Sequence, residues 1–217
     1  MTDYAAARDA MVDRQVRTAD VTSYPIIDAM LTVPRERFAP AALRAVAYAG
    51  EHLTLAPRRV LLDPRTFAKM IDAADPGPDD LVLDVGCGLG YSTAVLARMA
   101  AAVVAVEEDA PMARSAAATL TELEVDNAEV IEAPLVGGAA EHAPYNVILV
   151  EGGVEEMPEA LRGQLREGGR MVFVRMDGEY GWCELVTRID GNFSRRRMFD
   201  AAAPVLPGFE KQAAFEF

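Results

Sequence analysis

Residues 81–99 read LVLDVGCGLGYSTAVLARM, and this stretch decides the fold. An apolar run of strand length comes first, then three glycines at alternate positions, and then a helical stretch from Tyr91 to Met99. The glycines Gly86, Gly88 and Gly90 carry no Cβ, so a ligand can approach the backbone closely there. This order of strand, glycine-rich turn and helix predicts an α/β fold with a ligand site at the end of the strand.

The same alternation continues toward the C-terminus. Strands that are apolar on both faces and alternate with helices along the chain are typical of a mostly parallel sheet that is covered on both faces. From Cys183 onward the pattern changes to strands separated by tight turns, which predicts an antiparallel edge. The further strands are expected over residues 102–106, 128–132, 146–150 and 170–175, and the helices over residues 111–123 and 158–165.

A cluster of helix breakers separates this α/β region from a helical front. Residues 75–80 read DPGPDD, and helices are predicted before them over residues 5–16, 24–31 and 64–74. With 217 residues the chain is short for two enzymatic domains. We therefore expect one domain, in which residues 1–75 supply helices and a substrate loop and residues 76–217 supply the cofactor-binding core.

Composition restricts the class of partner. A formal net charge of −13 argues against nucleic acid as a partner, since phosphate binding needs clustered cations. The longest apolar run has eight residues, Met99 to Val106, against about 18 for a membrane span. Two cysteines suggest a reducing compartment, and the two histidines, His52 and His142, are too far apart for metal-ligand spacing. We expect a cytoplasmic protein without a metal, a nucleic-acid partner or a membrane anchor.

The second predicted strand is followed by an acidic residue whose spacing from the glycine loop is typical of a ribose-binding carboxylate. Glu107 lies 21 residues after Gly86, and its two carboxylate oxygens could accept both hydroxyl protons of a ribose. A dinucleotide fingerprint would need a glycine at position 91, where this chain has Tyr91. The loop can instead hold the methionine end of S-adenosylmethionine, with Asp84 placed to orient the ammonium group.

Several segments together resemble the protein-L-isoaspartate O-methyltransferase family over almost the whole chain. Residues 11–17 read MVDRQVR, residues 33–40 read VPRERFAP and residues 144–150 read PYNVILV, in addition to the glycine loop and Glu107. The resemblance implies a Rossmann-like, seven-stranded class I methyltransferase fold with N-terminal helices. It also implies methylation, with S-adenosylmethionine as cofactor, of the free α-carboxylate of isoaspartyl residues in damaged proteins.

The chain departs from the pattern of that family in three places. The family carries a loop of the form G-x-G-Q-T-x-S-x-P, whereas residues 56–64 read APRRVLLDP, so that Val60 and Leu62 stand at the threonine and serine positions. The G-D-G turn of the family is replaced by Ala133-Pro134-Leu135, and Asn146 stands in place of an aspartate.

Arg58 and Arg59 are the candidates for holding an anionic acceptor, because guanidinium groups bind carboxylates bidentately. The alternative for both is a solvated surface charge. We group Leu62 with them as a catalytic position, since it replaces the serine. Two other functions stay open: a methyltransferase with a small-molecule acceptor, and a non-catalytic cofactor-binding protein. The predicted cofactor-binding residues are Asp84, Gly86, Cys87, Gly88, Leu89, Gly90, Tyr91, Ser92, Glu107, Glu108, Pro134 and Leu135.

Overall fold

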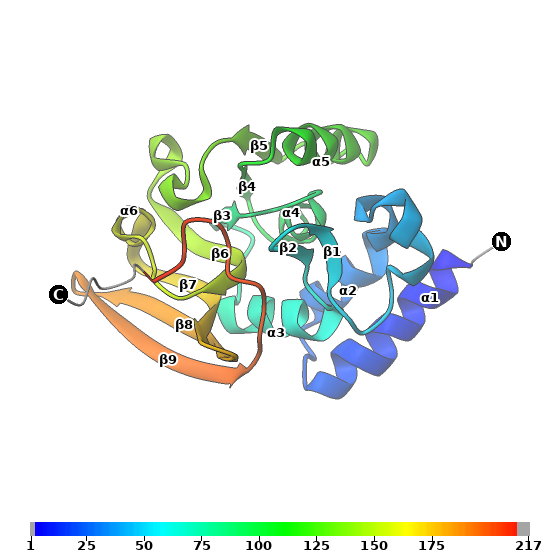
Figure 1. Cartoon of the computed structure of the whole chain (residues 1–217), viewed down its shortest axis with the longest axis horizontal. Helices are drawn as coiled ribbons and strands as arrows, with labels where there is room; N and C mark the ends of the chain where they lie inside the picture. Colours follow the sequence, from blue (N-terminus) through cyan, green and yellow to red (C-terminus); the bar gives the residue numbers. More distant parts are fainter. Residues whose placement is uncertain (1–2, 212–217) are drawn as a thin grey trace.

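The computed structural model describes residues 3–211, and its centre is a seven-stranded sheet (Figure 1). The strands lie in the order β5-β4-β3-β6-β7-β8-β9. The first five strands in that order run parallel, and β8 and β9 add an antiparallel edge. The predicted fold class is therefore confirmed. The strands are β3 (Leu81–Val85), β4 (Ala102–Glu107), β5 (Ala128–Glu132), β6 (Tyr145–Val154), β7 (Leu165–Asp177), β8 (Tyr180–Ile189) and β9 (Asn192–Asp200).

The N-terminal part is helical, as predicted. Helix α1 (Tyr4–Met11) continues as a π-helix over Val12–Val16, and α2 (Tyr24–Thr32) ends where Val33 adopts an extended conformation before Pro34. Short 3₁₀ turns follow over Arg17–Ala19, Arg35–Phe38 and Ala41–Val46.

Two of the longer helices begin at an aspartate that caps the first turn. Asp63 and Asp109 each accept a hydrogen bond from a backbone N–H of the first turn, at Thr66 and Met112. The helix predicted over residues 158–165 is shorter, because Leu165 already pairs with Tyr145 in the sheet. The helices are α3 (Pro64–Ala74), α4 (Tyr91–Ala97), α5 (Ala110–Glu122) and α6 (Glu159–Gly163), with 3₁₀ turns over Leu135–Gly137 and Ala140–His142.

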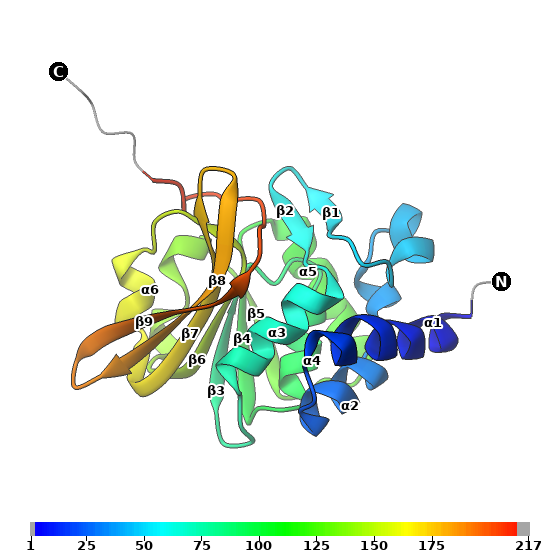
Figure 2. The same ribbon diagram turned by 90° about the horizontal axis from the view of Figure 1, so that it is seen from below.

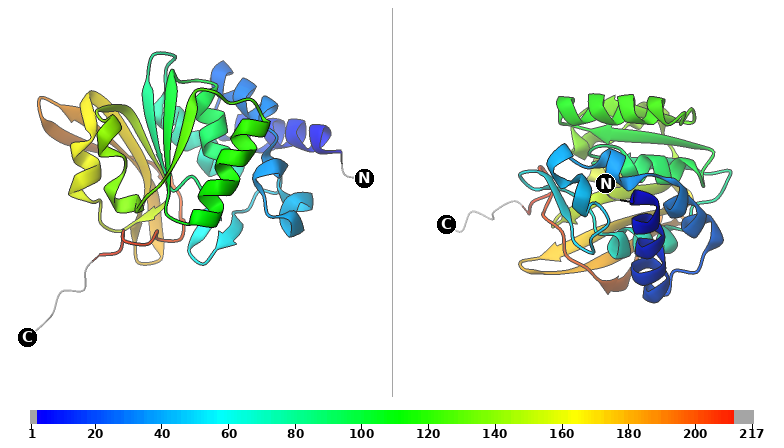
Figure 3. Two further views of the ribbon diagram at one scale, coloured as in Figure 1. Left: turned by 90° about the horizontal axis from the view of Figure 1, so that it is seen from above. Right: turned by 90° about the vertical axis from the view of Figure 1, so that its right-hand side faces the viewer.

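A hydrophobic core lies on each face of the sheet. On one face, Val82, Leu149 and Val172 pack with apolar residues of α2, α3 and α4. The opposite face carries a second core with residues of α6 and of the segment after β9. Figure 3 shows helices on both sides of the strands. Strands β3, β4 and β6 are buried on both faces, so their apolar residues run on without alternation, which is why these strands could be recognised in the sequence.

A small hairpin outside the main sheet was not predicted. Strands β1 (Leu53–Ala56) and β2 (Arg59–Leu61) pair antiparallel across Pro57 and Arg58. Arg58 has a φ of 63°, and a proline followed by a residue with positive φ is the pattern of a type II turn. Figure 2 shows this hairpin beside the segment that follows β9, and Arg59 of the hairpin contacts Glu107 at the carboxyl end of β4.

Within residues 3–211, no helix is both long and apolar enough to cross a membrane.

Candidate cofactor and methyl-transfer site

The glycine loop follows β3, whose two neighbours in the sheet, β4 and β6, lie on opposite sides of it. In open parallel sheets, ligands bind at the carboxyl ends of the strands at such a point, where the chain connections change direction. Gly86, Gly88 and Gly90 have φ values of 80°, 58° and 94°, which an L-residue adopts only with strain. The sequence requires glycine here because of the backbone conformation and because other groups approach closely.

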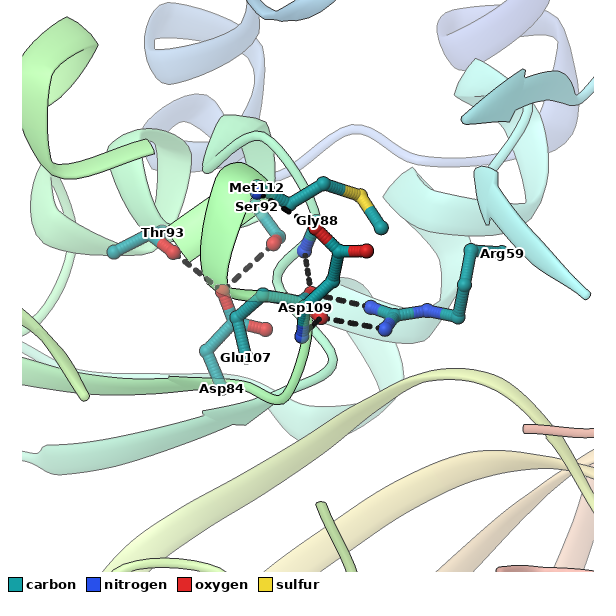
Figure 4. Close-up of polar contacts among 8 residues, drawn as sticks. All are labelled: Arg59, Asp84, Gly88, Ser92, Thr93, Glu107, Asp109 and Met112. Carbon is teal, nitrogen blue, oxygen red and sulfur yellow. Dashed lines mark hydrogen bonds and ion pairs between the residues drawn. The ribbon is translucent and has the colours of Figure 1, made fainter. Parts of the chain in front are cut away.

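Glu107 lies at the end of β4 and is fully buried. Its Oε1 accepts hydrogen bonds from Nη1 of Arg59 at 2.6 Å and from the backbone N–H of Asp109 at 3.0 Å. Its Oε2 accepts from the backbone N–H of Gly88 at 2.7 Å and from Nη2 of Arg59. Figure 4 shows the planar guanidinium of Arg59 facing both carboxylate oxygens. The carboxylate predicted to bind ribose is thus bonded to the chain itself.

Asp84, on β3, is fully buried and holds the start of α4 (Figure 4). Its Oδ2 accepts hydrogen bonds from the hydroxyls of Ser92 and Thr93, both at 2.7 Å, whereas its Oδ1 has no partner. Burial raises the pKa of Asp84 to about 6, although the two hydroxyls oppose the shift. Asp84 therefore combines a structural role with one free acceptor oxygen.

Glu151 is a residue that the sequence analysis missed. It follows Val150, which pairs with Val85 of β3, and only 4% of its surface is exposed. Its Oε1 has no hydrogen-bond partner. Burial, and secondarily the neighbouring Asp84, raises its pKa well above the usual value for glutamate. The signal in the sequence was a lone acid inside the apolar run VILVEGGV of residues 147–154.

The acidic groups of this edge fit the chemistry of S-adenosylmethionine. Asp84 and Glu151 each offer a buried, unpartnered oxygen, and a cationic ligand with a sulfonium and an ammonium would satisfy such groups. Glu107 stands where a ribose diol acceptor is needed, at the end of the neighbouring strand. These carboxylates therefore fit S-adenosylmethionine, except that Arg59 already occupies the acceptor positions of Glu107.

Arg58 and Leu62 lie apart from these acids. Arg58, at the hairpin turn, donates from Nε to the carbonyl of Val205 at 2.8 Å and from Nη2 to that of Leu206 at 3.0 Å. Leu62 is fully buried, and its carbonyl accepts from Nη2 of the buried Arg35 at 2.6 Å. A buried hydrocarbon side chain offers no polar group to an acceptor, so any role for Leu62 is one of shape.

The remaining predicted residues differ in exposure. Burial raises the pKa of the Cys87 thiol well above its usual value, which favours a lining role over a nucleophilic one. Tyr91 is buried under the Arg35 guanidinium, 4.8 Å from the ring centroid. Leu135 is buried and Leu89 half-buried, whereas Glu108 and Pro134 are exposed beside the loop.

A hollow of 440 Å³ lies at the carboxyl ends of β6 and β7, where they meet β8 and the segment after β9. Trp182 lines it together with the cations Arg175 and Lys211 and the acids Glu155 and Glu156.

The chain matches known proteins over most of its length. Residues 6–198 match the sequence model of the family described as Protein-L-isoaspartate(D-aspartate) O-methyltransferase (PCMT). A protein-L-isoaspartate O-methyltransferase of Koribacter versatilis is 36% identical over 92% of this chain and 90% of its own length. Another of that name, from Pelotomaculum thermopropionicum, is 34% identical over 89% of this chain and 85% of its own length.

The fold is also shared with a solved structure. A protein-L-isoaspartate O-methyltransferase from Plasmodium falciparum, in complex with S-adenosyl-L-homocysteine, superposes with a TM-score of 0.78. The match covers 95% of this chain and 99% of that chain at 18% identity. At this identity the likeness concerns the fold.

Proposed function

Because this chain belongs to the protein-L-isoaspartate(D-aspartate) O-methyltransferase family, we propose that it methylates the carboxylate of isoaspartyl residues in proteins, with S-adenosylmethionine as the methyl donor. One observation carries the proposal. The glycine loop and the carboxylate of Glu107 lie at the ends of two adjacent parallel strands, which is the place where open α/β sheets bind nucleotides.

The residues that would hold the cofactor are those with free or exchangeable acceptors. Glu107 would accept the ribose hydroxyls after Arg59 has moved, and Asp84 and Glu151 would face the positive charges. When bound, S-adenosylmethionine supplies an electrophilic methyl group on a sulfonium.

The chain itself needs little acid–base chemistry for this reaction. A carboxylate acceptor is already ionised at neutral pH, since its ordinary pKa is near 4. What the protein must supply is orientation and exclusion of water, and positioning alone is worth roughly 7–11 kcal/mol of barrier in favourable cases. The burial of Asp84, Glu107 and Glu151 supports a site from which water is excluded.

The hollow beside Trp182 offers space for an acceptor, but its charge does not select a carboxylate. It is lined by two cations, Arg175 and Lys211, and by three acids, Glu155, Glu156 and Asp177. Arg58 and Arg59 stay predicted as acceptor ligands, and this role requires that their present hydrogen bonds be exchanged.

A second candidate is methyl transfer to a different acceptor. It is favoured by the buried Leu62, which stands where the serine of the family's loop would offer a hydroxyl. A substrate that needs no hydroxyl from the enzyme would fit this site better than one that does.

The experiment compares two peptides of the same sequence, one with an isoaspartyl and one with an aspartyl residue. Each is incubated with the protein and methyl-labelled cofactor, and the base-labile methyl ester is measured as released methanol. We expect label in the isoaspartyl peptide alone, and none with Glu107→Ala. Retention of S-adenosylhomocysteine without label in either peptide would point to another acceptor, and failure to bind it at millimolar concentration would refute the proposal.

A further inference from the structure

The hydrogen-bonding capacity of Glu107 is completely used within the chain. An ionised carboxylate has about four acceptor positions on its two oxygens. Four donors fill them here: the backbone N–H groups of Gly88 and Asp109 and the two terminal nitrogens of Arg59. No position remains for the two hydroxyls of a ribose.

The backbone N–H donors belong to the loop and the strand end, so the exchangeable pair is Arg59. Its guanidinium presents two parallel N–H groups to the carboxylate, which is also how the two neighbouring hydroxyls of a ribose would be presented. We propose that Arg59 is a built-in competitor for the ribose position, so that the β1–β2 hairpin must leave Glu107 before the cofactor binds. The inference rests on the proposed function, because it concerns the cofactor of that reaction.

A second contact of the hairpin points the same way. A Cβ built on Gly88 would lie 2.6 Å from Cδ1 of Leu55, so this side chain already lies against the glycine loop. A Cβ on Gly86 would lie 3.4 Å from Nη2 of Arg59. Leu55 and Arg59, from the two strands of one hairpin, thus occupy the space over the glycines that a ligand needs.

The hairpin is held in this position from outside the site. Arg58, next to Arg59, bonds the carbonyls of Val205 and Leu206 and forms an ion pair of 2.5 Å with Glu210. A two-stranded hairpin is marginal by itself, and β1 and β2 form a sheet separate from the main one. It can therefore move without breaking a strand pair of the seven-stranded sheet.

The binding experiment measures the affinity for S-adenosylhomocysteine by titration calorimetry. Arg59→Met removes the competitor and keeps an unbranched side chain of similar length, and Arg65→Met, at an exposed position of α3, is the matched control. If the open form makes up about 1–10% of the molecules, Arg59→Met should bind roughly 10 to 100 times more tightly than the unmodified protein, and Arg65→Met within about twofold of it.

Two results would decide against the inference, and a third would support it. Equal or weaker binding by Arg59→Met overturns the competitor role and leaves the proposed function intact. Absence of binding by both proteins at millimolar ligand overturns the proposed function and the inference with it. Binding by the variant alone supports both.

Hydrogen exchange of the unmodified protein gives a test that requires no variant to fold. The amides of residues 53–61 should exchange faster when S-adenosylhomocysteine is added, because the hairpin is displaced, while those of residues 86–90 should exchange more slowly. Slower exchange in residues 53–61 would mean that the hairpin closes over the ligand, and would overturn the inference.

Discussion

Arg59→Met should lower the unfolding free energy when Glu107 is present, and should leave it unchanged or raise it when Glu107 has been removed. Both side chains are almost fully buried, with exposed fractions of 5% and 0%. Arg59→Met deletes two hydrogen bonds to a charged group, each worth roughly 1.5–3 kcal/mol, and the expected loss of unfolding free energy is about 3–5 kcal/mol. In a Glu107→Leu background the same substitution removes a cation that has lost its partner, so it should be neutral or stabilising.

The assay is urea unfolding of the four proteins of this double-mutant cycle at pH 7. The exposed pair Arg98–Asp28, with exposed fractions of 41% and 46%, serves as the control. Its corresponding cycle should give a coupling below about 1 kcal/mol. If Arg59→Met costs the same free energy with and without Glu107, the pair is not the desolvated interaction described here.

Burial raises the pKa of Glu151, so the folded state keeps its proton at a pH where the unfolded chain has lost it; the stability that this provides is present at low pH and is lost as the pH rises toward the folded pKa. The unfolding free energy of Glu151→Gln should therefore rise relative to that of the unmodified protein, by up to about 1.4 kcal/mol per pH unit above about pH 4.5. Urea unfolding of both proteins at pH 5 and 7.5 measures this difference, and a difference independent of pH would contradict the prediction. Gly90→Ala should lose about 1–3 kcal/mol, because φ is 94° and the new Cβ would lie 3.1 Å from Cβ of Ala116. In thermal unfolding, Gly163→Ala is its control, since a Cβ there meets nothing within 4 Å; equal melting temperatures for the two variants would show that Gly90 carries no such constraint.

Much of the sheet could be predicted because its strands are apolar on both faces. Strand β4 matches its predicted bounds to within one residue, because it is buried as an uninterrupted apolar run. Strand β5 also has the predicted bounds, although it lies at the edge of the sheet and none of its residues is buried. Residues 53–61 gave no such signal. Their strands have four and three residues, and Arg58 adopts a positive φ that is usual for glycine, so the hairpin depends on contacts with distant segments.

The sequence by itself determined the glycine loop, the acid at the end of the next strand and the family, because these depend on spacing along one strand–turn–helix unit. The state of that site was decided only by the tertiary structure. Arg59 and Glu107 are 48 residues apart, and their pairing requires that the hairpin and the carboxyl edge of the sheet be brought together. Local patterns carry no information on such a contact, since its energy comes from desolvation and bidentate geometry that exist only after the chain has folded.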